Sequence, residues 1–237
     1  MGRGQDADDP LDYHDLYRDA VRAASNESIL VEVGTFVGRS AIKMATMIAE
    51  SEKSIAFFAI DTWCGSCGTD PVQDNHLDRY LGGGLESGKA WDMFVENVRQ
   101  WNVSHLIHPL QMLSVIAAQQ FADQSIDFVF IDASHTYAGV MCDIYAWYPK
   151  VRGGGIIAGH DYIRGWDGVI KAVDEFFGPR AIEIHPPQSW LFRKPADAAY
   201  QPQGYARRAV EPLVLSSGDT SNEQYPARKP VILPRGW

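Results

Sequence analysis

The feature of this 237-residue chain that most constrains its fold is a regular alternation of short apolar runs with amphipathic segments. The strand-like runs are residues 28–33, 54–61, 105–110, 125–132 and 153–162. The helical patterns are residues 16–24, 38–50, 89–102, 114–122, 139–151 and 165–178. Such alternation is typical of βαβ units around a parallel sheet, and residues 180–194 add two short strands around a Pro-Pro turn. We therefore predict an α/β fold.

Two segments break the alternation. Residues 64–88, "CGSCGTDPVQDNHLDRYLGGGLESG", are too long for an ordinary strand-to-helix connection, and we predict a substrate lid there. Residues 195–237 are rich in Pro, Ser and Gly, and we predict an extended or disordered tail on the body or on a neighbouring subunit. Residues 1–194 then form one domain with the lid as an insertion.

Composition narrows the possible partners. The formal net charge of −9 argues against nucleic acid, which is bound through neutralised phosphates. We find no signal-peptide pattern and no apolar run near the roughly 20 residues that span a bilayer. Three cysteines make no disulfide framework. We expect a cytoplasmic protein that acts on a small molecule, without nucleic acid or membrane partners; a homo-oligomer remains open.

In an open parallel sheet, ligands bind beyond the carboxyl ends of the strands. The first such end, "VEVGTFVGRSA", has Gly34 and Gly38 around a turn where a ligand could approach the backbone and the N–H groups of the next helix. The spacing is not the dinucleotide pattern, and a plain glycine turn is the alternative. Asp61 ends the second strand, where an acid can hold ribose hydroxyls or cap a helix.

The fourth and fifth strand ends carry the most specific pattern. "FIDASHTY" places Asp132 and His135 after one strand, and "IAGHDY" places His160 and Asp161 after the next. If these strands are neighbours, the two carboxylates converge and offer ligands for a divalent cation beside a candidate base. The alternative for each histidine is a turn residue with a satisfied hydrogen bond.

The stretch that begins at Phe58, "FAIDTWCGSCGTD", also resembles the dithiol site of thioredoxin-like proteins. A reactive dithiol sits at the start of a helix, but "GTDPVQDNH" after Cys67 is no helix start. A zinc site from Cys64, Cys67 and His76 lacks a fourth ligand. We therefore assign the cysteines to a loop and the function to Asp61.

These motifs together resemble class I S-adenosylmethionine-dependent methyltransferases. The similarity runs from about residue 16 to residue 194 and is closest to the macrocin O-methyltransferase and cephalosporin-hydroxylase-like branch, of the methyltransferase family 24 type. "DFVFIDASHTYAGVMCDIYAWYPKVRGGGIIAGHDY" is its most specific part. The resemblance implies a Rossmann-like, mostly parallel sheet of seven strands with one antiparallel strand and helices on both faces.

The resemblance also implies roles for individual residues. The methionine moiety of S-adenosylmethionine would be surrounded by Glu32, Gly34, Thr35, Gly38 and Ser40. Asp61 would bind the ribose with Trp63 packed beside it, and residues 111–114, including Gln111 and Ser114, would border the adenine; Asp132 would also face the cofactor.

In metal-using members of the family, one carboxylate on the fourth strand end and two acidic residues on the fifth bind magnesium. Asp132 and Asp161 match two of the three, and His160 replaces the other carboxylate. Imidazole is a poor magnesium ligand, so magnesium, another divalent ion or no metal all remain open. The catalytic base of the family corresponds to His135.

The sequence thus predicts an O-methyltransferase that acts on a hydroxyl of a sugar-type or natural-product-type small molecule. His135 would be the base, with Asp132 and Asp161 as further catalytic residues. The alternatives are a nicotinamide-dependent oxidoreductase, a non-catalytic S-adenosylmethionine-binding protein and a hydroxylase-like enzyme.

Overall fold

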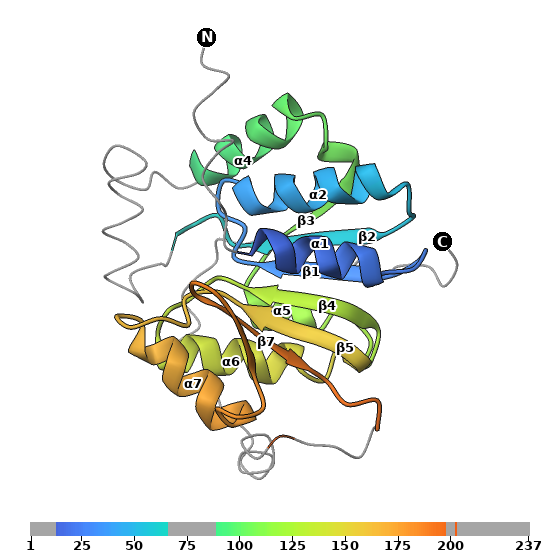
Figure 1. The fold of residues 1–237 in the computed structure, drawn as a ribbon. Helices are drawn as coiled ribbons and strands as arrows, with labels where there is room; N and C mark the ends of the chain where they lie inside the picture. Colours follow the sequence, from blue (N-terminus) through green and yellow to red (C-terminus); the bar gives the residue numbers. More distant parts are fainter. Residues whose placement is uncertain (1–12, 66–88, 198–201, 203–237) are drawn as a thin grey trace.

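The computed structural model describes residues 13–65, 89–197 and 202, and its centre is a seven-stranded sheet (Figure 1). The strands are β1 (Ile29–Val33), β2 (Ala56–Asp61), β3 (Ile107–Gln111), β4 (Ile126–Ile131), β5 (Val151–Gly159), β6 (Glu183–His185) and β7 (Ser189–Arg193). Their order in the sheet is β3-β2-β1-β4-β5-β7-β6. Only β7 runs against its neighbours. The predicted fold, with one antiparallel strand, is confirmed.

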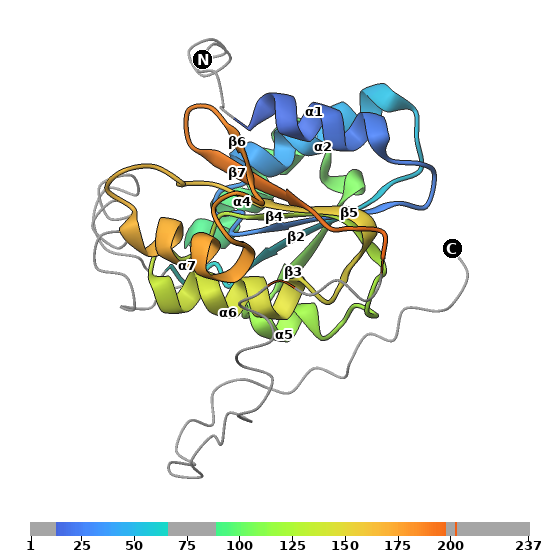
Figure 2. The ribbon, with the colours of Figure 1, turned by 60° about the horizontal axis from the view of Figure 1, so that its bottom comes forward.

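Helices cover both faces of the sheet (Figures 1 and 2). One face carries α1 (His14–Ala23), α2 (Arg39–Ser51) and α4 (Lys89–Gln100). The other carries α5 (Ser114–Ala118), α6 (Tyr137–Trp147) and α7 (Asp167–Phe177). The short 3-10 helix η1 (Ser104–Leu106) leads into β3. The result is a three-layer α/β/α arrangement.

The two cores follow from the period of two along each strand. On β4, Phe128 packs with α1 and α2, while the next residue, Val129, packs with α6 and α7. Leu30 and Val31 of β1 divide in the same way. Because the central strands are buried on both faces, they read as continuous apolar runs in the sequence.

Several predicted boundaries were wrong by two to four residues. The helix predicted over 139–151 spans Tyr137–Trp147, and the strand predicted over 153–162 spans Val151–Gly159. The helix predicted over 114–122 ends at Ala118, where N–H groups bond three residues back and buried Phe121 turns into the core. The third strand was predicted over 105–110 but spans Ile107–Gln111, because η1 takes up its expected beginning. The lid beyond residue 65 and most of the tail lie outside the described residues.

The sheet order decides which strand ends meet. β4 lies between β1 and β5, with Val33 opposite Ile131 and Ile131 opposite Gly159. The residues that follow, Gly34, Asp132 and His160, therefore begin side by side. The order reverses between β1 and β4, and such a switch point opens a crevice at the carboxyl ends of the strands.

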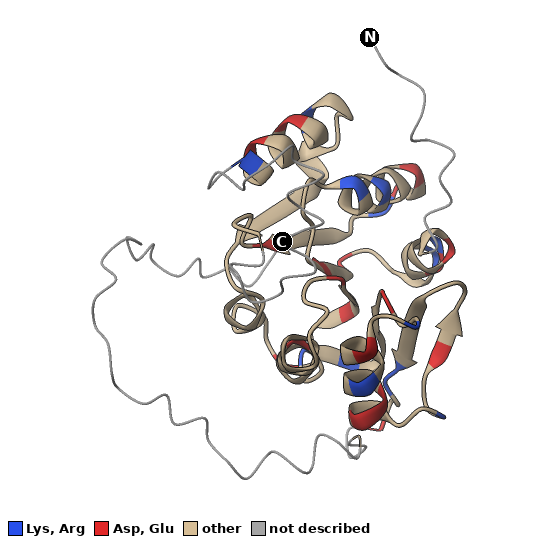
Figure 3. Ribbon diagram, turned by 90° about the vertical axis from the view of Figure 1, so that its left-hand side faces the viewer, with Lys and Arg blue, Asp and Glu red and all other residues tan. Residues whose placement is uncertain are grey.

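The helices carry charges of both signs. Figure 3 shows Lys and Arg interspersed with Asp and Glu along α1, α2, α4 and α7. Within the described residues, no helix combines the length and hydropathy that a membrane crossing would require.

Candidate active site

The turn after β1 depends on two glycines with positive φ angles. Gly34 has a φ of +90°, and a Cβ there would lie 1.9 Å from the carbonyl oxygen of Asp132. Gly38 has a φ of +88°, and a Cβ would lie 2.8 Å from the Phe94 ring. The sequence suggested that these glycines make room for a ligand. In the structure, the protein itself fills both Cβ directions, so the fold alone already requires glycine here.

Glu32, on β1, is a buried carboxylate bound by hydroxyl groups. Tyr17 of α1 donates to Oε2 at 3.0 Å, and Ser40 of α2 donates to Oε1 at 2.5 Å. Burial raises the pKa of Glu32 to about 8, although both hydrogen bonds favour the ionised form. Glu32 thus joins α1, β1 and α2 beneath the glycine turn.

Thr35 is the residue of this turn whose side chain most needs a partner. Its hydroxyl oxygen is buried, yet it makes no hydrogen bond within the part of the chain that the structure describes. Buried hydroxyls are almost always hydrogen-bonded in proteins. A cofactor at the carboxyl end of β1 could supply the missing partner.

Asp61, at the end of β2, binds backbone N–H groups of the glycine turn and of its own loop. Phe36 donates to Oδ2 at 2.8 Å and Trp63 donates to Oδ1 at 2.7 Å. Burial raises the pKa of this carboxyl, against the effect of the hydrogen bonds. Backbone N–H groups of Thr35 and Thr62 also bond this carboxylate, so the protein itself supplies donors for its roughly four acceptor positions, and the predicted bond to the ribose remains a prediction.

Trp63 lies deeper than the sequence suggested. Its side chain is 1% exposed and packs against Trp91 and Phe94, with ring centroids 4.7 and 4.8 Å away. Its indole N–H donates to the carbonyl of Phe36 at 2.6 Å. These contacts make Trp63 a core residue that fixes the glycine turn, while its predicted place beside the ribose remains a prediction.

The two predicted adenine residues face in different directions. Gln111 is exposed at the end of β3, and its amide lies 3.4 Å from the carbonyl oxygen of Thr62. Ser114 begins α5 and faces α6, where it accepts a hydrogen bond from the indole of Trp147 at 2.9 Å and bonds Asp143. Gln111 is therefore the more accessible of the two.

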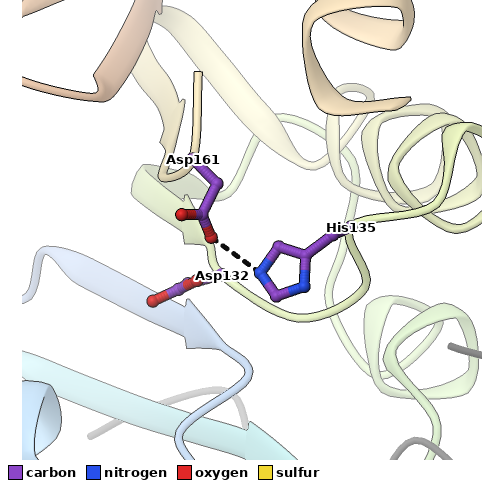
Figure 4. A group of neighbouring side chains, drawn as sticks. All are labelled: Asp132, His135 and Asp161. Atoms are coloured by element: carbon purple, nitrogen blue, oxygen red, sulfur yellow. Dashed lines mark ion pairs between the residues drawn. The ribbon is translucent and has the colours of Figure 1, made fainter. Parts of the chain in front are cut away.

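The carboxyl ends of β4 and β5 bring the predicted acid–base residues together (Figure 4). One ligand atom each of Asp132, His135 and Asp161 lie within 4.8 Å of one another. Nε2 of His135 lies 2.6 Å from Oδ2 of Asp161, the ion pair drawn in Figure 4. The convergence of the two strand ends predicted from the sequence is confirmed.

Asp161 is the most constrained member of this cluster. Its φ is +59°, an uncommon conformation for a residue with a Cβ, and such strain is concentrated at functional sites. Burial raises its pKa, but hydrogen bonds from His135 and His160 outweigh burial and hold the pKa below its usual range. Asp161 is therefore an ionised acceptor between two imidazoles.

His160 lies on the other side of the carboxylates. Its Nδ1 is 3.3 Å from Oδ1 of Asp161 and 3.8 Å from Oδ1 of Asp132. Its Nε2 is 3.2 Å from the amide nitrogen of Gln188, and its ring meets Tyr13 edge-on. His160 thus contacts the residues just before β7 and α1 as well as the acids.

The comparison with known families comes from the region that carries these features. A family model described as a methyltransferase domain matches residues 31–162, which is more than half of the chain and runs from the middle of β1 through β5. The chain belongs to this methyltransferase family. Its sheet order and the turn after β1 make it a class I S-adenosylmethionine-dependent methyltransferase.

Solved structures agree on the fold. The O-methyltransferase NovP superimposes with a TM-score of 0.59 at 17% identity, over 78% of this chain and 80% of NovP. A Streptococcus mutans protein described as a methyltransferase, in complex with SAH, superimposes with a TM-score of 0.50 at 12% identity, over 76% of this chain and 96% of that protein. At these identities the similarity shows the architecture.

A curated relative has no described function. An uncharacterized protein of Sinorhizobium fredii is 27% identical over 132 residues, which is 56% of this chain. The matched part is only 13% of the length of that relative. This chain therefore spans only a small part of the length of that relative.

The methyltransferase site has a donor set that could bind a divalent ion. The described cluster joins His135 with the carboxylates of Asp132 and Asp161, whereas the sequence placed His160 beside them, and the role of His160 toward a metal stays a prediction. His160 approaches Oδ1 of both carboxylates, whereas His135 pairs with Oδ2 of Asp161. Two oxygens and one imidazole nitrogen suit a transition ion better than magnesium, which prefers oxygen ligands.

Sequence reasoning missed several residues of the methyltransferase site. Trp166 stacks on His135, with ring centroids 4.1 Å apart and an interplanar angle of 26°. Tyr17 and Asp143 hold the predicted residues Glu32 and Ser114. The sequence could have indicated Asp143, because it is a lone acid in the otherwise apolar stretch "VMCDIYAW". An aromatic residue in a loop or on an apolar helix face carries no comparable signal.

Proposed function

We propose that this methyltransferase transfers the methyl group of S-adenosylmethionine to a hydroxyl oxygen of a small molecule. The observation that carries this proposal is the pairing of His135 with Asp161 at 2.6 Å, on strand ends adjacent to the glycine turn. The leaving group, S-adenosylhomocysteine, is a neutral thioether and needs no proton from the protein. An alcohol acceptor, however, must lose its hydroxyl proton. A positioned imidazole with an ionised partner meets that requirement.

The proposed reaction is an in-line displacement. The acceptor oxygen forms a bond to the methyl carbon, the carbon–sulfur bond breaks, and its electron pair stays on sulfur to give S-adenosylhomocysteine. The hydroxyl proton passes to His135. The carboxylate of Asp161, 2.6 Å from Nε2, stabilises the imidazolium that forms. Alignment of the three reacting atoms supplies several kcal/mol more.

The cofactor would lie along the ends of β1, β2 and β3. Thr35 would gain a partner for its buried hydroxyl, Asp61 would bind the ribose, and Gln111 would border the adenine. Glu32 and Ser40 would support the glycine turn beneath the cofactor, because the hydroxyl of Ser40 already donates to the carboxylate of Glu32. The family match favours this assignment over a nicotinamide-dependent oxidoreductase.

A divalent ion held by Asp132, His135 and Asp161 would be an addition that replaces the bond between His135 and Asp161, because Nε2 cannot bind the ion and donate to Asp161 at once. Such an ion lowers the pKa of a bound hydroxyl and orients it. Dialysis against a chelator, followed by assay and readdition of single metals, tests the addition. Activity that survives the chelator leaves His135 as the base without metal assistance.

Replacement of His135 is the central test of the proposed function. Acceptor candidates with hydroxyl groups are screened by release of S-adenosylhomocysteine, and cofactor affinity is measured by calorimetry. His135→Ala should slow turnover by roughly 10²–10⁴-fold, as expected for a lost general base, and leave cofactor affinity nearly unchanged. His105→Ala, at an exposed position in η1, is the matched control. Equal turnover of both variants would refute His135 as the base.

A further inference from the structure

Trp166 is the residue that covers the flat face of the proposed base. The indole stacks on the His135 ring with centroids 4.1 Å apart. Its backbone is fixed at the start of α7, because its N–H donates to Ile163 and its carbonyl accepts from Val169, at 3.1 and 2.9 Å. The stack is thus built on a helix end.

The start of α7 also presses on the backbone of the His135 loop. A Cβ at Gly168 would lie 2.5 Å from the carbonyl oxygen of His135 and 2.7 Å from the backbone nitrogen of Tyr137. One turn later, the ammonium of Lys171 lies 4.6 Å from the centre of the Tyr137 ring. The start of α7 and the His135 loop therefore pack closely against each other over several residues.

His135 is consequently held from two directions by the same stretch of chain. Asp161 bonds its edge at 2.6 Å, and Trp166, five residues later, covers its face. A single hydrogen bond leaves the χ2 angle of histidine broad. A flat aromatic partner stacked on the ring restricts that rotation.

We propose that Trp166 is a positioning residue of the methyltransferase, which holds the His135 ring in the plane that its bond to Asp161 and its attack on the acceptor proton both require. This inference rests on the proposed function of His135 as the base. Trp166 also packs against the core formed with α6 and α7, so a purely structural role is the competing explanation.

Substitutions at position 166 separate these two explanations. Trp166→Phe keeps a flat ring and should stay within about threefold of wild-type turnover, whereas Trp166→Leu keeps an apolar side chain without a ring and should lose about tenfold or more, as about 1.4 kcal/mol is tenfold. Cofactor affinity should be unchanged in both. Trp101→Leu is the matched control, because Trp101 is 63% exposed at the end of α4.

A double-mutant cycle shows whether Trp166 acts through His135. In the His135→Ala background, Trp166→Leu should cause no further loss of turnover, because residues that act as a unit are not additive. A full additional loss, or a Trp166→Phe variant as impaired as Trp166→Leu, would overturn the proposal. Wild-type turnover of His135→Ala alone would instead refute the proposed function.

The ring of His135 can also be observed without any acceptor. In the wild type, NMR signals of the His135 ring protons should be shifted upfield by the indole, and the shift should be smaller in Trp166→Phe and lost in Trp166→Leu. The His135→Ala variant assigns these signals. Ring signals of His135 that are the same in wild type and Trp166→Leu would show that the stack is absent in solution and would overturn the inference.

Discussion

The two halves of the site shift the pKa of their buried carboxylates in opposite directions. In the half at the ends of β1 and β2, where we propose the cofactor and which we call the cofactor half, Glu32 and Asp61 are bound by hydroxyl and backbone N–H groups, and burial raises the pKa of both. In the acid–base half, Asp161 is also largely buried, but two imidazoles hold its pKa below the usual range. Burial alone therefore does not decide the charge of a strand-end acid. The chemical nature of its partners does.

The two halves also differ in how closely they are packed and in how many ionisable groups they contain. The glycine turn is packed against protein on every side that a Cβ would occupy, and its acid at position 61 binds the turn itself. The acid–base half instead collects ionisable groups from the ends of β4 and β5. We infer that the first half is built to hold a fixed shape and the second to exchange a proton.

The largest expected effect is on the contact that joins the two halves. Gly34→Ala places a Cβ 1.9 Å from the carbonyl oxygen of Asp132 at a positive φ. Gly178→Ala also has a positive φ, but no atom lies within 4 Å of its Cβ. The control should lose about 1–3 kcal/mol to strain, and Gly34→Ala about 1–3 kcal/mol more or fail to fold.

Urea unfolding of the two glycine variants measures this difference. If both variants lose the same free energy of unfolding, the turn is less closely packed on β4 than the structure shows. The close contact between Gly34 and Asp132 would then not join the two halves of the site.

Removal of the acid from the cofactor half should give the next largest effect. Asp61→Ala removes hydrogen bonds to a charged group, each worth about 1.5–3 kcal/mol, so affinity for S-adenosylhomocysteine should fall by roughly 10- to 200-fold. Calorimetry measures the affinity. The exposed acid Asp92 of α4 provides the control variant, Asp92→Ala. Equal affinity of the two variants would remove Asp61 from the cofactor site.

The opposite pKa shifts predict opposite pH dependences of stability. The pKa of Glu32 is raised from 4.5 to about 8 on folding, so the folded state binds more protons between these values and its stability falls as pH rises through them. Glu32→Gln should therefore have a flatter stability curve from about pH 5 to pH 8. The free energy of unfolding, measured in urea across this range, provides the check.

Asp161 supplies the contrasting curve. Because its folded pKa lies below the unfolded value of 3.8, it contributes stability that is present above that value and is lost as pH falls through its folded pKa. The wild type should thus exceed Asp161→Asn in stability near neutral pH and approach it in acid. The same slope for both acids would contradict the division into two kinds of half.

The smallest expected effect concerns the cysteines after β2. Cys64 lies in a bend whose backbone N–H bonds the hydroxyl of Thr62, and Cys67 lies outside the described residues. Cys64→Ser combined with Cys67→Ser should leave cofactor affinity unchanged within about twofold, because neither half of the site uses a thiol. Loss of binding, or insulin-reductase activity of the wild type, would revive the dithiol interpretation.

Much of the fold and part of the site could be predicted from the sequence. The strands β1, β2 and β4 were recognisable because a strand buried on both faces reads as a continuous apolar run, whereas β3 lies at the edge of the sheet and is mostly exposed. The acids and histidines at positions 132, 135, 160 and 161 were recognisable because they directly follow such runs. These are local patterns, in which each residue type reports its own burial.

Only the tertiary structure decided which of these residues became partners. The sequence placed Asp132, His135, His160 and Asp161 on two strand ends, but the pairing of His135 with Asp161 depends on the register of β4 against β5. Trp166 reached His135 because α7 folds back onto that loop. Pairing register and side-chain direction arise from packing between segments that are distant in the chain. No pattern within one segment encodes them, whereas burial and strand period are properties of the segment itself.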